Sequence, residues 1–219
     1  MKYLNVKAIL FIITSVSLVL LLIINYIQGV ETIDFFTMAK QVPVIVTINS
    51  VIIAIFIKWL WRIPWLPSFL VPFPDLNGTW QGQLKSDWIA PDGKKVKPIP
   101  IFLTVKQSFF TISCVIRTGE STSYSFNEGF LIDNEKQIKQ LCYSYKNEPE
   151  INVQSRSNTH SGTALLDIKG NKKKMHLEGK YWTDRKTTGL ISVEFESPII
   201  IDKLPDDTPK HPVKGKFLK

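Results

Sequence analysis

Three side chains suited to binding an anionic ligand occupy alternate positions in the run KYWTDR, residues 180–185. Successive side chains of a β-strand point to opposite faces, so Tyr181, Thr183 and Arg185 would share one face. A tyrosine ring can stack on a nucleobase, and a guanidinium can bind phosphate oxygens through two parallel hydrogen bonds. The spacing therefore predicts a binding site for bases and phosphates rather than a reaction centre.

Three further residues are candidates for the same site. Tyr143 and Tyr145 form a second same-face pair, and Arg117 precedes a turn signal at Thr118-Gly119. We therefore predict six ligand-binding residues: Arg117, Tyr143, Tyr145, Tyr181, Thr183 and Arg185. For each tyrosine the alternative is packing within a sheet, which is a common role of this residue in strands.

Signatures of catalysis are missing from the sequence. The histidines His160, His176 and His211 are scattered, and there is no His-Glu-x-x-His, Gly-x-Ser-x-Gly or phosphate-binding Gly-x-x-x-x-Gly-Lys motif. Cys114 and Cys142 match no metal-ligand spacing. The sequence thus predicts a binding protein that is not an enzyme, with no metal and no cofactor.

The elements that must position these residues are strands. From residue 76 onward, short alternating runs are broken by Gly, Asn, Asp and Pro, without a sustained helical period. We predict eight strands, at residues 79–88, 99–106, 110–117, 121–132, 137–146, 161–169, 173–183 and 187–196. Short turns between them favour an up-and-down antiparallel barrel, which has no exposed edges and can enclose one small ligand. A β-sandwich is the alternative fold.

The first predicted strand opens with Gly78-Thr79-Trp80. A tryptophan at this position can fill one end of a small barrel, and a glycine beside it allows close approach of rings or backbone. We therefore predict that Gly78 and Trp80 form a structural plug rather than a ligand contact.

Two apolar runs precede the barrel. Residues 8–30 carry no formal charge and, as a helix, would be about 34 Å long, enough to cross a hydrocarbon core of roughly 30 Å. This run is longer than the apolar core of a signal peptide, which is the alternative. Residues 41–61, interrupted only by Lys58, form a second predicted span, and Asn49 within it is a candidate contact to another helix.

The two spans predict a transmembrane hairpin over residues 1–63. Basic residues near the span ends divide four to one, Lys2, Lys7, Lys58 and Arg62 against Lys40. The positive-inside rule then places both termini and the barrel in the cytoplasm. A proline-rich linker follows at residues 64–75, then the barrel at residues 76–197 and a C-terminal tail at residues 198–219, which we expect to be mobile.

Two spans, a proline-rich joint and the run DLNGTWQG, residues 75–82, opening an eight-stranded domain resemble one family in particular. These are the two-transmembrane, β-strand-rich effectors of bacterial CBASS antiphage systems, encoded beside cyclic-nucleotide synthases called CD-NTases. The most specific stretches are residues 76–82 and residues 181–189, the latter with Thr183, Arg185 and Gly189.

The resemblance implies that the barrel is a receptor for a cyclic dinucleotide rather than for a DNA or RNA polymer. It also implies that ligand binding drives homo-oligomerisation, and that the clustered helices disrupt the lipid of the bacterial inner membrane and kill the infected cell. The net charge of +8 suits an anionic ligand and an anionic membrane surface equally well.

Two other functions remain open. Gly78-x-Trp80 also resembles the opening of lipocalins, so a membrane-tethered barrel could carry a lipid or another small apolar ligand. A barrel packed solid would instead bind only another protein. Arg185 distinguishes these functions, because a position at the barrel mouth with Tyr181 and Thr183 favours an anion, whereas a wholly apolar interior favours lipid.

Overall fold

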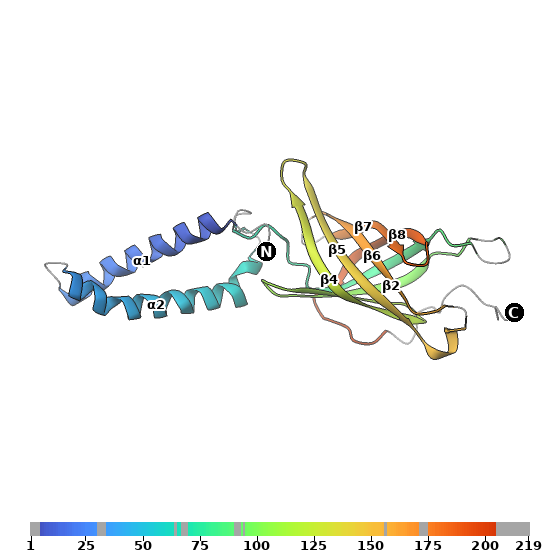
Figure 1. The fold of residues 1–219 in the computed structure, drawn as a ribbon, viewed down its shortest axis with the longest axis horizontal. Coiled ribbons are helices and arrows are strands. Elements are labelled where there is room, and N and C mark those ends of the chain that lie inside the picture. Colours follow the sequence, from blue (N-terminus) through green and yellow to red (C-terminus); the bar gives the residue numbers. More distant parts are fainter. Residues whose placement is uncertain are drawn as a thin grey trace. The chain divides into compact units, whose positions relative to one another are not determined.

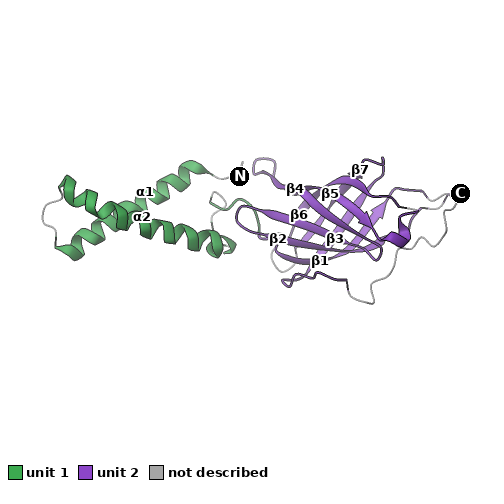
Figure 2. Ribbon diagram, turned by 60° about the horizontal axis from the view of Figure 1, so that its bottom comes forward, with its two compact units in different colours: residues 1–74 green, residues 75–219 purple. Residues whose placement is uncertain are grey.

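The computed structural model describes residues 5–29, 34–63, 65–66, 70–89, 93, 95–155, 157–170 and 175–204 of the 219-residue chain. The chain divides into two compact units, Met1–Pro74 and Asp75–Lys219 (Figure 2). The boundary between them falls within the predicted linker, residues 64–75.

The first unit contains the two predicted helices. They are α1 (Val6–Gln28) and α2 (Phe35–Lys58), followed by the short 3-10 helix η1 (Leu60–Arg62). Asn5 caps α1 by accepting the backbone N–H of Ala8, and Gly29 ends the helix in the left-handed conformation. Windows of both helices, with mean hydropathies of 2.7 and 1.9, are apolar and long enough to span a membrane.

The second helix begins at Phe35, earlier than the predicted residue 41. The side chain of Asp34 accepts the backbone N–H of Thr37 at 3.1 Å and so caps the helix there. Lys40, which limited the apolar run in the sequence, is an ordinary helical residue. The connection between the two helices is therefore shorter than the sequence suggested.

The second unit is a closed antiparallel barrel in which each strand pairs with its neighbours in the sequence and β1 pairs with β8 (Figure 1). The strands are β1 (Gly78–Ser86), β2 (Ile99–Gln107), β3 (Ile112–Arg117), β4 (Ser121–Asp133), β5 (Ile138–Pro149), β6 (His160–Lys169), β7 (His176–Thr183) and β8 (Thr188–Ser197). This confirms the predicted up-and-down barrel and excludes the sandwich. The predicted start of the seventh strand, residues 173–174, lies outside the described residues.

The barrel interior is filled by apolar side chains at alternate strand positions. The core includes Ile101, Leu103, Val105, Leu141, Leu166, Leu177, Ile191 and Val193, each almost inaccessible to solvent. This alternation is what a strand with one buried face requires. The strand ends beyond these layers are the places where a ligand site can form.

One end of the barrel is closed by Trp80. Its indole is 1% exposed, donates from Nε1 to the Leu76 carbonyl at 3.1 Å and packs edge-on against Phe195. Gly78 has a φ of +134°, and a Cβ there would lie 2.4 Å from the Ser197 carbonyl oxygen, so only glycine fits. The packing gives both residues the positions that a barrel plug requires.

The beginning of the predicted tail lies against the barrel. The carbonyl of Ile199 accepts from Thr79 Oγ1 at 2.7 Å, and that of Ile201 accepts from Thr104 Oγ1 and from Arg117, both at 3.3 Å. These contacts join residues 199–201 to β1, β2 and β3. The mobility expected for the tail as a whole stays a prediction. Residues 205–219 lie outside the described residues.

Candidate functional site

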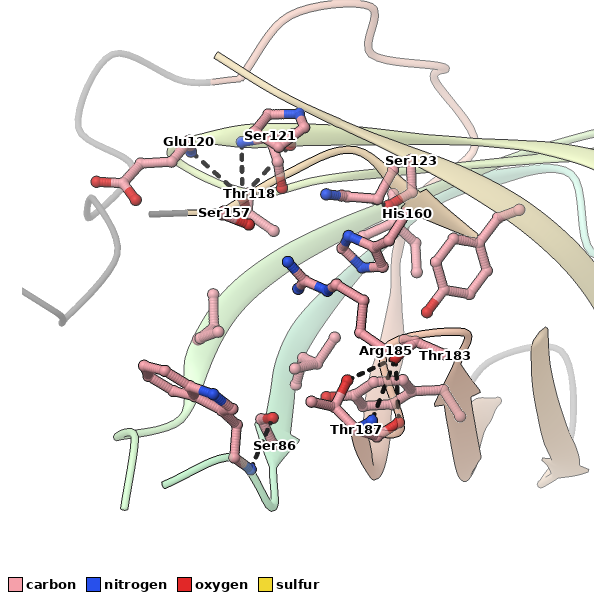
Figure 3. Close-up of a pocket in the computed structure, with 18 of the residues that line it drawn as sticks. Ser86, Thr118, Glu120, Ser121, Ser123, Ser157, His160, Thr183, Arg185 and Thr187 are labelled. Atoms are coloured by element: carbon pink, nitrogen blue, oxygen red, sulfur yellow. Dashed lines mark hydrogen bonds between the residues drawn. The ribbon is translucent and has the colours of Figure 1, made fainter. Parts of the chain in front are cut away.

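The end of the barrel opposite Trp80 is open. In an up-and-down barrel the odd strands end and the even strands begin at the same rim, and here that rim surrounds a cavity of about 320 Å³ (Figure 3). Every strand contributes to its lining. Inward positions that are apolar in the core become polar at the rim: Leu84 is followed by Ser86, Ile116 by Thr118 and Tyr145 by Asn147.

Two tyrosine rings pack against glycines of the neighbouring strands. Tyr145 lies opposite Gly162, and Tyr181 lies opposite Gly189. A Cβ on either glycine would come within 2.6 Å of the facing ring. The absence of a side chain therefore lets each ring lie flat along the barrel wall while it lines the cavity.

Both tyrosines are neutral hydrogen-bonding groups at neutral pH. Burial raises the pKa of Tyr145, with a smaller contribution from Tyr181 in the same direction. Burial also raises the pKa of Tyr181, and a hydrogen bond with the Ser86 side chain opposes this shift. The two rings thus offer apolar faces and uncharged hydroxyls, which suit a planar base.

The β7–β8 turn places a hydroxyl pair and a cation at the rim. Thr183 Oγ1 and Thr187 Oγ1 lie 2.7 Å apart, and the Thr187 backbone N–H also donates to the Thr183 hydroxyl. Arg185 follows on this turn, and its guanidinium donates to the Asn158 carbonyl at 3.4 Å. Figure 3 shows Arg185 directed across the cavity, above Thr183 and Thr187.

His160 stands beside Arg185 (Figure 3). Its Nδ1 lies 3.1 Å from the same Asn158 carbonyl. Burial lowers the pKa of His160 most, the hydrogen bond to Asn158 raises it, and Arg185 lowers it further. The imidazole is therefore held neutral next to a fixed cation, and an arriving anion would favour its protonation.

The opposite side of the rim, on β3, β4 and β5, carries neutral polar groups and the carboxylate of Glu120. The Thr118 hydroxyl accepts the backbone N–H groups of Glu120 and Ser121 at 3.2 and 3.0 Å. Ser123 donates to Asn147 Oδ1 at 2.9 Å in a buried contact, which fixes the orientation of that amide. One side of the cavity is thus cationic, and the other offers hydroxyl and amide groups beside one carboxylate.

The connection between β5 and β6 borders the mouth. It contains the 3-10 helix η2 (Ile151–Val153), which is attached to the β3–β4 turn by a 2.9 Å bond from Glu150 N–H to the Glu120 carbonyl. Val153 is buried and lines the cavity. This connection narrows the rim beside the neutral polar groups.

The family of the chain follows from comparison with known proteins. One family model, described as Cap15, cyclic dinucleotide receptor domain, matches residues 71–194, more than half of the chain. The chain belongs to this Cap15 family. CD-NTase-associated protein 15 from Staphylococcus schleiferi is 28% identical over 150 residues, which cover 68% of this chain and 75% of the relative. The resemblance to CBASS effectors drawn from the sequence is thereby confirmed.

Four of the six predicted site residues line the cavity of the Cap15 domain: Tyr145, Tyr181, Thr183 and Arg185. Tyr143 lies deeper, 1% exposed, with its ring centroid 6.1 Å from that of Tyr145. Its hydroxyl finds no hydrogen-bond partner within the described part of the chain. Tyr143 packs on the core side of Tyr145 and does not line the cavity.

Arg117 belongs to the outer surface of the barrel. Its guanidinium bonds Thr104 Oγ1 and the Ile201 carbonyl, because the inward positions of β3 are those of Cys114 and Ile116. The structure does not bring Arg117 to the cavity.

Sequence reasoning missed several polar lining residues: Ser86, Thr118, Ser123, Asn147, His160 and Thr187. A usable signal was present, because most of them lie on the same strand face as a buried apolar residue, at the next alternate position toward the strand end. That signal can be used only once the barrel and its open end are known, because the same sequence pattern could also occur at the closed end or on the outer face.

Asn49, the residue predicted to contact another helix, lies in the helical unit. Asn49 Nδ2 donates to Ser17 Oγ and to the Ile45 carbonyl, both at 3.0 Å, and so joins α2 to α1 within one chain. A second contact joins Gln41 Nε2 to Asn25 Oδ1 at 2.8 Å. Both bonds tie the hairpin together in an otherwise apolar helix pair.

Proposed function

We propose that the barrel binds a cyclic dinucleotide at its open mouth. The observation that carries this proposal is the cavity in a Cap15-type domain, where the rings of Tyr145 and Tyr181 lie beside the guanidinium of Arg185. Such a ligand has two bases that can stack on rings and two phosphates that attract cations. Arg185 would bind a phosphate, while Thr183 and Thr187 would donate to phosphate or ribose oxygens.

The lining argues against the lipid alternative. The deep core is solid with aliphatic side chains. The cavity above it has apolar walls, such as Ile99, Ile116 and Ile191, together with hydroxyl, amide, carboxylate and cationic groups. A lipid carrier needs an apolar cavity for acyl chains, so the position of Arg185 at the mouth favours an anionic ligand. The cavity also distinguishes this barrel from one that is packed solid.

We further propose that the chain is a CBASS effector, functionally paired with a CD-NTase that makes its ligand. In this scheme the helices cross the bacterial inner membrane as a multi-pass hairpin, with both termini and the barrel in the cytoplasm. Ligand binding would drive homo-oligomerisation, and the gathered helices would disrupt the membrane and kill the infected cell. The apolar helices and the basic residues flanking them support this proposal.

The ligand test uses the full-length chain in detergent micelles, titrated calorimetrically with a panel of cyclic dinucleotides and their linear counterparts. We expect binding of at least one cyclic member and a loss of about tenfold or more for Arg185→Ala, since hydrogen bonds to charged groups stabilise a complex by about 1.5–3 kcal/mol. Lys180→Ala is the matched control, because Lys180 is an exposed cation of β7 that does not line the cavity.

Failure of the whole panel to bind folded protein would refute the receptor function. Equal losses from Arg185→Ala and Lys180→Ala would show that general charge, not the mouth, attracts the ligand. The membrane step is tested separately, by release of a dye from liposomes that contain the full chain. Release should require the bound ligand and should be reduced with Arg185→Ala at ligand concentrations that just saturate the wild type.

A further inference from the structure

Strand β4 separates from β3 after a short ladder. The registered pairs run from Arg117↔Thr122 to Val115↔Tyr124 and no further. Towards β5 the same strand is paired along its whole length, to Asp133↔Ile138. Figure 1 shows β4 and β5 continuing together as a long hairpin. Residues 126–133 therefore have one paired edge and one edge without a strand partner among the described residues.

The separation has a local cause. The backbone N–H of Cys114 donates to Ser125 Oγ at 2.8 Å, so a side chain takes the place of a β4 carbonyl. The Ser125 hydroxyl also donates to the carboxylate of Glu128, and the register with β5 shifts between Ser125 and Asn127. A bulge of this kind turns a strand and ends its pairing on one side.

The sequence of this edge lacks the lysines and prolines that usually protect an edge strand against pairing. Exposed edges are normally blunted by lysines, prolines or a covering segment. The run FNEGFLI, residues 126–132, contains neither lysine nor proline, and its one charge is Glu128, which Ser125 engages. Around it Tyr124, Phe126 and Leu131 are 47%, 65% and 45% exposed.

We propose that this edge pairs with the β4 edge of a second copy of the chain, antiparallel about a two-fold axis. A two-fold contact needs only one surface, which the edge supplies to itself. If Gly129 faces Gly129 of the other copy, Glu128 lies opposite position 130 and Asp133 lies opposite Ser125, so no like charges meet. A Cβ on Gly129 would meet nothing within 4 Å, which shows that the outer face is open at the centre of the pair.

The C-terminal segment is a poorer occupant of the edge. Residues 205–219 include Pro205, Pro209 and Pro212, which have no N–H to donate to a ladder. Pairing of two copies supplies the contact for the assembly step, and in that role it rests on the proposed function. The β4 pairing does not require any particular ligand, so the pairing and the proposed receptor function can be refuted separately.

The test compares three forms of the full-length chain in detergent, with and without the cyclic dinucleotide panel, by light scattering after size exclusion. They are the wild type, Phe126→Lys with Leu131→Lys, and the control Trp182→Lys with Leu190→Lys. Trp182 and Leu190 are 46% and 48% exposed but lie on strands paired at both edges. We expect the β4 variant to weaken self-association about tenfold or more, because lysines on an edge strand oppose pairing with another strand, and the control to change it little.

A crosslink tests the register. Gly129→Cys, made with Cys142→Ser because Cys142 lies opposite Gly129 on β5, should give an oxidised dimer. Lys180→Cys on the outside of β7 should not. Wild type that stays monomeric under every condition, a β4 variant that associates like wild type, or equal crosslinking at both cysteines would overturn the proposal. A Gly129→Cys crosslink that appears only after deletion of residues 205–219 would assign the edge to the tail and also overturn it. A specific crosslink without binding of any cyclic dinucleotide would refute the receptor function and leave the β4 pairing standing.

Discussion

Adding one methyl group at Gly189 should displace Tyr181 from the cavity wall and destabilise the barrel. A Cβ at this position would lie 2.5 Å from Tyr181 Cε1 and 2.2 Å from the Lys85 carbonyl oxygen, where ordinary contacts begin near 3.4 Å. Both the ring and the β1–β8 pairing must therefore shift. Overpacking of this kind costs about 1–3 kcal/mol.

The consequence can be measured by thermal unfolding of the full chain in detergent, followed by circular dichroism of the strands. At roughly 3 °C per kcal/mol for a unit of this size, Gly189→Ala should lower Tm by about 3–10 °C. Ligand affinity should fall as well, because the displaced ring loses its hydrogen bond to Ser86. Gly162→Ala, which brings a Cβ within 2.6 Å of the Tyr145 ring, should behave in the same way.

Gly129→Ala is the matched control. It lies on a strand of the same barrel, but a Cβ there meets no atom within 4 Å. Replacing glycine at an unstrained position stabilises a protein by about 0.4–1 kcal/mol, so Tm should stay level or rise slightly. A Gly189→Ala protein that melts at or above the wild-type temperature would refute the argument that the two tyrosines depend on their glycines.

Three further predictions concern other parts of the chain. The pKa of His160 lies below its ordinary value of 6.5. A bound phosphate would raise the pKa of His160, so ligand binding should be accompanied by uptake of a proton. Affinity should then increase as pH falls from the liganded pKa to the free pKa, by at most about tenfold per pH unit, and His160→Gln should flatten this profile. Arg117→Ala should leave affinity unchanged but increase amide exchange around Ile201, whose carbonyl it binds; a large affinity loss would contradict the outward placement. A double-mutant cycle of Asn49→Ala and Ser17→Ala, read by unfolding in mixed micelles, should show a coupling of about 0.6–2 kcal/mol, and zero coupling would contradict the bond between them.

The agreement between prediction and structure is closest where a local pattern repeats. Long apolar runs identified both helices, because the length of an apolar run can be read directly from the residue order. Alternation identified all eight strands to within a few residues of their ends. The start of α2 was misplaced because Lys40 interrupts the apolar run, although Asp34 three residues before Thr37 was a usable cap signal.

The site was predictable only in part, because alternation along one strand does not show which face points into the barrel or how deep a given side chain lies. Tyr181, Thr183 and Arg185 were placed correctly relative to one another by their spacing. Tyr143 and Tyr145 share a face in the same way, yet one is in the core and the other lines the cavity. Depth depends on the register with β4 and β6, which the spacing on a single strand does not contain.

The sequence by itself determined the two long apolar helices, the eight strands and the same-face set of Tyr181, Thr183 and Arg185, because each follows from the composition or period of a local element. Only the tertiary structure decided that Trp80 closes one end, that His160 and Arg185 share the Asn158 carbonyl, and that Arg117 holds the C-terminal segment. These facts join strands far apart in the chain, and closure of the barrel sets which of their ends meet.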